Sequence, residues 1–190
     1  MTFLVPEIIL RSLPRRQLGE NVEVFEAIRS RRSIRKYRKD PVPEDLVLKI
    51  LDAGRWAPSA SNLQPWSFIV LRDEEVKRKV AEATSYGKFL VDAPLGIAVV
   101  IDPRVSHRSG GVEDGAIATQ NMLLAAHALG LGTCWIGSYN SGYEEKVKGI
   151  LNIPKKHRLL SIISIGFPAE SPTKTRKELR EIMFTDKYSR

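Results

Sequence analysis

Two basic clusters near opposite ends of the chain combine residue types that bind phosphate. In the first cluster, Arg31, Ser33 and Arg35 would share one face of an extended segment, because side chains alternate along such a segment. In the second, Lys174 and Arg176 have the same two-residue spacing. Guanidinium groups bind phosphate in bidentate geometry, and a hydroxyl adds a neutral donor. The two clusters therefore predict a site for a phosphorylated ligand.

A polar loop between these clusters is held by two prolines, Pro58 and Pro65. It carries four amide or hydroxyl donors: Ser59, Ser61, Asn62 and Gln64. A rigid loop of neutral donors, added to the basic clusters, suits a phosphorylated heterocycle.

The chain lacks the motifs of several other chemistries. Its Gly130-Leu131-Gly132 run follows an expected helix and does not precede one, so it is not a dinucleotide or P-loop cradle. No Gly-x-Ser-x-Gly elbow is present. One cysteine, Cys134, and three scattered histidines do not form a zinc cluster, and we expect Cys134 to be a small buried side chain. We therefore predict no metal, and chemistry carried by a bound cofactor.

Composition limits the class of protein. At 190 residues and 43% hydrophobic content, the chain suits one globular domain. The net charge of +8 allows a nucleic-acid-binding module, but the cations are mixed with acids in helix-like runs and form no aromatic-rich basic stripe. No apolar run reaches the roughly 20 residues of a membrane span. With a single cysteine, no intrachain disulfide is possible, and we expect a cytoplasmic protein without membrane or nucleic-acid partners.

Hydrophobic periodicity predicts an α+β (α/β-like) fold, with a central mixed sheet flanked by helices. Residues 1–21 read as an N-terminal extension and residues 22–190 as a single domain. A helix with Val24, Phe25 and Ile28 on one side opens the domain. Further helices are expected at 44–56, 74–83, 112–129 and 143–151, and strands at 66–71, 95–101, 133–139 and 159–166. The alanine content of the 112–129 helix predicts close packing in the centre or at a subunit interface.

Five segments of the chain form a recognisable series: Arg31–Arg35, Ala57–Val70, Gln120–Ala126, Gly130–Gly137 and Lys174–Arg176. They occur in the order that is typical of the FMN-dependent nitroreductase family, and the chain resembles that family from about Val22 to Arg180. The resemblance implies a nitroreductase-like homodimer that binds FMN.

The resemblance also implies roles for individual residues. Arg31 and Ser33 match residues that hold the FMN phosphate, and Lys174 and Arg176 complete its shell. Arg35 matches a cation at the pyrimidine side of the flavin, where it would tune reduction electrostatically. The remaining cofactor-binding candidates are Arg32 in the first basic cluster, Pro58, Ser59, Ala60 and Asn62 in the loop that reaches the flavin of the other subunit, and Ile136, Gly137 and Ser138 in the turn beside flavin N5.

The implied activity is hydride transfer from NADH or NADPH, through flavin N5, to a small-molecule electron acceptor such as a nitroaromatic or a quinone. One shared cavity would make this a ping-pong cycle, and no protein side chain is expected to act as an essential acid, base or nucleophile. Two alternatives stay open: a specialised flavin-dependent reductase of dehalogenase-like type, and the basic nucleic-acid-binding module.

Overall fold

The computed structural model describes residues 23–105 and 111–188. The expected N-terminal extension, residues 1–21, lies outside the described residues, so the division of the chain at residue 22 stays a prediction. Residues 106–110, which contain His107, also lie outside them.

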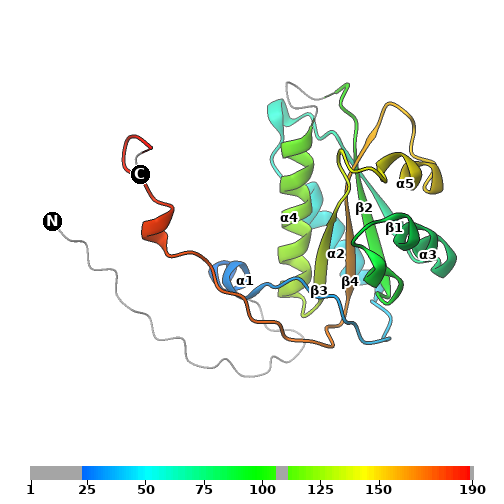
Figure 1. Ribbon diagram of the computed structural model, residues 1–190, viewed down its shortest axis with the longest axis horizontal. Helices are drawn as coiled ribbons and strands as arrows, with labels where there is room; N and C mark the ends of the chain where they lie inside the picture. Colours follow the sequence, from blue (N-terminus) through cyan, green and yellow to red (C-terminus); the bar gives the residue numbers. More distant parts are fainter. Residues whose placement is uncertain (1–22, 106–110, 189–190) are drawn as a thin grey trace.

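A four-stranded sheet forms the centre of the molecule (Figure 1). Its strands are β1 (Trp66–Leu71), β2 (Leu95–Ile101), β3 (Gly132–Gly137) and β4 (Arg158–Gly166), in the spatial order β1-β2-β4-β3. All neighbouring strands pair antiparallel. The mixed character that we expected is limited to one isolated parallel bridge, between Ser33 and Thr133 at the free edge of β3.

Helices cover both faces of the sheet, which confirms the expected fold class. The helices are α1 (Val24–Ser30), α2 (Glu44–Arg55), α3 (Glu74–Ala83), α4 (Val112–Ala128) and α5 (Glu144–Ile150). One hydrophobic cluster joins α2 and α4 to one face, and a second joins α3 and α5 to the other. Figure 1 shows the resulting three layers, with the long α4 on one side of the sheet and α3 and α5 on the other.

The two central strands are apolar along their length because both faces are covered. Every residue of β2 is buried, as the continuous run at 95–101 predicted. The helix α4 packs closely on the sheet through small residues. A Cβ atom at Gly115 would lie 2.7 Å from Cδ2 of Leu160 in β4, so glycine at this position allows the close approach.

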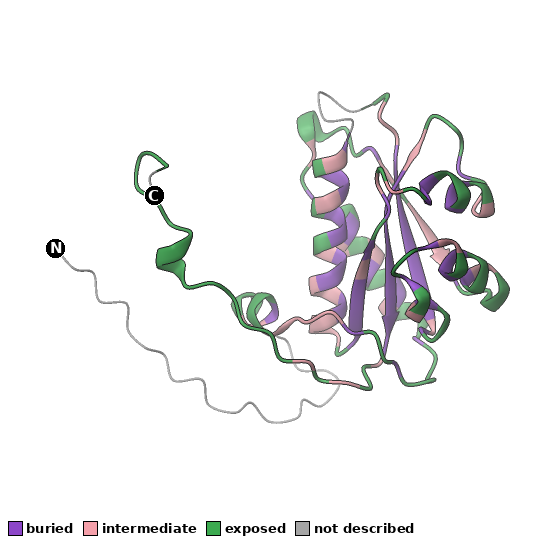
Figure 2. Cartoon of the chain, in the orientation of Figure 1, coloured by how far each residue is buried: buried purple, intermediate pink, exposed green. Residues whose placement is uncertain are grey.

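Two apolar segments of the chain lie outside this core. In α1, Val24, Phe25 and Ile28 are 58%, 73% and 53% exposed, although the sequence pattern gave them one common face. Beyond β4 the chain leaves the body of the molecule, and residues 174–188 are exposed (Figure 2). Single-chain packing therefore leaves the apolar side of α1 uncovered.

Candidate functional site

The first basic cluster lies in an extended segment along the free edge of β3. Ser33 forms the parallel bridge with Thr133, and the Ile34 N–H donates to the Thr133 carbonyl at 2.8 Å. On its other side, the same segment pairs with the chain that follows β4, where the Arg38 N–H donates to the Phe167 carbonyl at 2.9 Å. This pairing explains how the first and last parts of the chain meet.

In the part of the chain that the structure describes, Arg31 and Arg176 lie near each other without an ion pair to a carboxylate. Burial lowers the pKa of Arg31, and the nearby charges of Arg176 and Arg32 lower it further. Within residues 23–105 and 111–188, no acidic side chain forms an ion pair with Arg31 or Arg176. Lys174 is exposed two residues before Arg176. Uncompensated cations that repel one another are stabilised by an anion, and a dianionic phosphate fits this donor set.

The guanidinium groups of Arg32 and Arg35 are placed differently from that of Arg31. The Arg32 Nη1 donates to the carbonyls of Arg29, at 2.5 Å, and of Arg31, at 2.9 Å. Its guanidinium therefore caps carbonyl groups at the C-terminal end of α1. Arg35 is exposed, and its guanidinium lies 5.7 Å from the ring centre of Phe89. Its backbone N–H donates to Oε1 of Glu170 at 2.5 Å, which adds a second tie to the chain after β4.

A buried polar layer supports the extended segment from beneath. The Tyr37 hydroxyl donates to the Ile34 carbonyl at 2.5 Å and lies 2.7 Å from Oγ of Ser164. Burial raises the pKa of Tyr37 and also that of Cys134, which is 3% exposed. At neutral pH both groups are protonated, so neither is a ready base or nucleophile. The expectation of a buried, structural Cys134 is confirmed.

The turn after β3 presents one backbone donor to the same edge. In an antiparallel pair, successive N–H groups of a strand point alternately towards the partner strand and away from it. The Ser138 N–H points towards β4, where it donates to the Leu160 carbonyl at 3.0 Å. The preceding Gly137 N–H therefore points away from β4, towards the free edge. Ile136 and Ser138 are buried, whereas Gly137 is exposed. Of these three predicted residues, Gly137 is the one that a ligand can reach.

The polar loop after α2 contains a one-turn 3-10 helix, Ala60–Asn62, and is strained. Ser61, Asn62 and Gln64 have φ values of 50°, 56° and 49°, which non-glycine residues rarely adopt. The Ser59 hydroxyl accepts from the Gln64 N–H at 2.9 Å. Such strain persists only when surrounding contacts hold it, and it is concentrated at ligand sites.

Asp114 in the first turn of α4 anchors this loop, a role that the sequence pattern did not reveal. Its Oδ1 accepts from the Ala60 N–H at 3.1 Å. The basic cluster lies at the other end of α4, where the Ser30 hydroxyl is 2.7 Å from Nε2 of His127. Thirteen residues of helix, about 20 Å, separate Asp114 from His127. Within one chain, the loop and the basic cluster are therefore not brought together.

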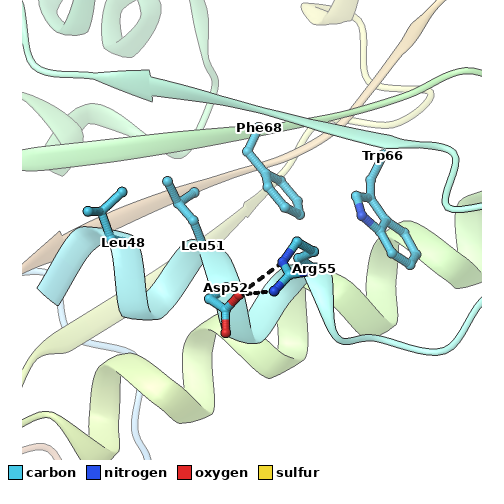
Figure 3. Close-up of a pocket in the computed structure, with 6 residues that line it drawn as sticks. All are labelled: Leu48, Leu51, Asp52, Arg55, Trp66 and Phe68. Atoms are coloured by element: carbon cyan, nitrogen blue, oxygen red, sulfur yellow. Dashed lines mark hydrogen bonds and ion pairs between the residues drawn. The ribbon is translucent and has the colours of Figure 1, made fainter. Parts of the chain in front are cut away.

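A separate groove of about 530 Å³ lies between α2 and β1 (Figure 3). Its lining is mostly apolar, and Arg55 forms an ion pair with Asp52 at 2.5 Å. The lining residues are Leu48, Leu51, Asp52, Arg55, Trp66 and Phe68. None of them is among the predicted cofactor-binding residues. Among the described residues, no group of His, Cys, Asp and Glu could hold a metal ion, and no helix is long and apolar enough to span a membrane.

Comparison with known proteins identifies the fold and the motif order. A family model described as the Nitroreductase family matches residues 28–88 and 82–167. The chain belongs to the nitroreductase family. A provisionally named NADH dehydrogenase/NAD(P)H nitroreductase of Methanothermobacter thermautotrophicus is 46% identical over 155 residues, which cover 80% of each chain.

Solved structures of the nitroreductase family share the architecture. An FMN-dependent nitroreductase from Clostridium difficile has a TM-score of 0.80 and 32% identity, and the match covers 85% of this chain and 98% of that chain. A provisionally named nitroreductase from Desulfovibrio desulfuricans, solved in complex with FMN, has a TM-score of 0.78 and 34% identity. That match covers 90% of this chain and 100% of the other.

Proposed function

We propose that this nitroreductase-family protein is an FMN-dependent oxidoreductase. It takes hydride from NADH or NADPH and passes the electrons to a small-molecule acceptor such as a nitroaromatic or a quinone. The observation that carries this function is the group of neighbouring cations, Arg31, Arg32 and Arg176, without an ion-pair partner for Arg31 or Arg176 among the described residues, at the edge of β3 that also carries the exposed Gly137. The FMN-bound relative supports the choice of FMN over other phosphorylated heterocycles.

The residues of the site match the parts of FMN. Arg31, Ser33, Lys174 and Arg176 would bind the phosphate, and Arg35 would place its charge at the pyrimidine side of the ring. FMN supplies reversible acceptance of hydride at its N5 atom. The chain itself binds and orients the cofactor, and its raised Tyr37 and Cys134 pKa values agree with a reaction that uses no protein acid, base or nucleophile.

The active form is a homodimer with the site between subunits. The Pro58–Asn62 loop and the basic cluster lie at opposite ends of α4, so a second copy is needed to bring a loop to each cluster. The exposed apolar side of α1 and the exposed tail residues Leu179, Ile182 and Met183 provide surface for that contact. Both reductant and acceptor then use one cavity in turn, as in a ping-pong cycle. A buried free thiol suits a reducing cytoplasm.

A direct experiment tests this function. The purified protein is expected to be yellow, to release FMN on denaturation, and to lose its flavin absorption when NADH or NADPH is added without oxygen. A panel of nitroaromatic and quinone acceptors should then restore the absorption. A colourless protein that neither binds added FMN nor oxidises either nicotinamide would contradict the proposal.

A further inference from the structure

The polar loop after α2 has little packing of its own to hold its shape. Residues 60–64 are all exposed. Three residues of the loop, Ser61, Asn62 and Gln64, nevertheless keep positive φ values, a conformation that costs free energy in residues other than glycine. A loop of this kind keeps its shape only where contacts with the rest of the chain fix it.

Two hydrogen bonds tie the ends of the loop to the rest of the chain. At the end of the loop, the Pro65 carbonyl accepts from the Asp102 N–H at 2.8 Å, which extends the backbone pairing of β1 with β2. At its start, the Ala60 N–H donates to Oδ1 of Asp114 at 3.1 Å. The first bond belongs to the sheet, whereas the second depends on one side chain. Removing the Asp114 carboxylate should therefore release the start of the loop and leave the sheet paired.

Asp114 is itself held on a rigid part of the fold. It lies in the first turn of α4 and is 7% exposed. At the next residue, Gly115, a Cβ atom would lie 2.8 Å from Cγ2 of Ile101 in β2, so the start of α4 lies directly against the sheet. A carboxylate on such a base restrains the loop and does not move with it.

We propose that Asp114 is a positioning residue for the FMN of the other subunit, because it holds the strained loop in the shape that binds the flavin. This inference rests on the proposed FMN-dependent function and its homodimer. About 20 Å of α4 separates Asp114 from His127, which lies beside the basic cluster of the same chain. The loop that Asp114 anchors therefore serves the basic cluster of the second copy. An already ordered loop loses less conformational entropy when FMN binds, which raises the affinity.

Removing the anchor tests the first half of this inference. Asp114→Ala takes away the acceptor of the Ala60 N–H and should weaken FMN binding about 10- to 100-fold, the effect of losing one hydrogen bond to a carboxylate. Asp114→Asn keeps a side-chain oxygen, so its affinity should lie between those of wild type and Asp114→Ala. Glu74→Ala is the matched control, because Glu74 is an exposed acid in the first turn of α3, on the other face of the sheet. Fluorescence titration of the FMN-free proteins measures these affinities, and hydrogen exchange in residues 59–64 should become faster in Asp114→Ala alone.

A mixed dimer tests whether Asp114 acts across the subunit boundary. One subunit carries Arg31→Ala and the other Asp114→Ala, each with a different affinity tag, so that the mixed dimer can be purified. If Asp114 serves the other subunit, both changes fall in one site, and the second site is wild type. We therefore expect one of the two sites to bind FMN with wild-type affinity. If Asp114 served its own subunit, each site would carry one change and both would be weakened.

The outcomes separate this inference from the function on which it rests. If wild-type protein binds no FMN, the proposed function fails and the inference fails with it. If wild-type protein binds FMN as a dimer, but Asp114→Ala and Asp114→Asn keep the affinity of Glu74→Ala, the function stands and the role of Asp114 is overturned. A mixed dimer without a site of wild-type affinity would also overturn it. Asp114→Asn takes the place of Asp114→Ala in both experiments if circular dichroism shows that the alanine variant does not fold.

Discussion

At the scale of single residues, Arg31 gives the most direct test of the proposed phosphate site. Its guanidinium is partly buried beside Arg176, and no carboxylate in the described part of the chain pairs with it. Arg31→Ala should weaken FMN binding by about 1.5–3 kcal/mol, the contribution of a hydrogen bond to a charged group. Fluorescence titration of the FMN-free variant with FMN measures this change.

Arg32→Ala is the control for the Arg31 prediction. The Arg32 guanidinium already donates to the carbonyls of Arg29 and Arg31, so we expect its removal to affect FMN affinity less. Equal affinities for wild type, Arg31→Ala and the double variant Arg31→Ala/Arg176→Ala would show that the phosphate binds elsewhere.

Arg35 and Cys134 allow a test of where the chemistry is carried. Without Arg35, negative charge on the reduced flavin is less stabilised, and flavin reduction should slow by about 10- to 1,000-fold, as for loss of one electrostatic donor. Burial raises the pKa of Cys134, so Cys134→Ser should leave the rate nearly unchanged. Stopped-flow reduction by NADH or NADPH compares the FMN-loaded variants. A collapse with Cys134→Ser and a normal rate with Arg35→Ala would reverse these assignments.

The sequence predicted the local conformation of the first basic cluster, whose role in binding stays a prediction. Arg31, Ser33 and Arg35 alternate in a segment that is indeed extended along β3. The contact of Asp114 with the polar loop was not predicted, because its partner, the Ala60 N–H, is known only once the chain has folded. An isolated Asp near a helix start reads as a cap, and nothing local distinguishes an anchor for a distant loop.

At the scale of elements, the connection between the β3 turn, α5 and β4 includes an ion pair between the buried Glu144 and the partly exposed Arg158. Glu144→Gln should lower the free energy of unfolding at neutral pH by about 2–4 kcal/mol, because Arg158 loses its charged partner. Urea unfolding followed by circular dichroism measures the change. Lys146→Gln, at an exposed position of the same helix, is the control. Glu145 is unsuitable because it forms an ion pair with the buried Lys148.

The same pair predicts a pH dependence. Burial opposes the ionisation of Glu144, but Arg158 and the N–H groups of Asn140 and Leu159 outweigh it and lower the Glu144 pKa. Its stabilising effect is complete above the unfolded pKa of about 4.3 and is lost as the pH falls through the lower native pKa. The stability gap between wild type and Glu144→Gln should therefore narrow from pH 7 to pH 3. A gap that stays constant would mean that the charge is not the source of the stability.

Element types were predictable, but strand pairing was not. The continuous apolar runs of β2 and β4 could form only buried strands, and both are buried along nearly all of their length. Alternating helices and strands left parallel pairing open, so we expected a mixed sheet. The direction of each pairing depends on how the connections cross the sheet, and composition carries little information about that.

At the scale of the whole molecule, one chain does not bring together the loop and the basic cluster that the proposed site needs. The loop and the basic cluster are separated by the length of α4, and the apolar sides of α1 and the tail are uncovered (Figure 2). The sequence suggested a subunit interface through the alanines of α4. It could not give the distance between the loop and the basic cluster, which is the basis for proposing that a second copy completes the site.

Dimerisation and FMN binding should therefore be lost together. Wild-type protein should sediment as a dimer with two FMN at micromolar concentration, since obligate interfaces bury more than about 2,000 Å². Phe25→Asp places a charge on the uncovered side of α1 and should therefore favour the monomer and reduce FMN occupancy. Because Phe25 is 73% exposed in the single chain, its replacement should leave the fold intact. Glu23→Gln, at another exposed position beside α1, is the control. A wild-type monomer that keeps its flavin would show that one chain holds the complete site.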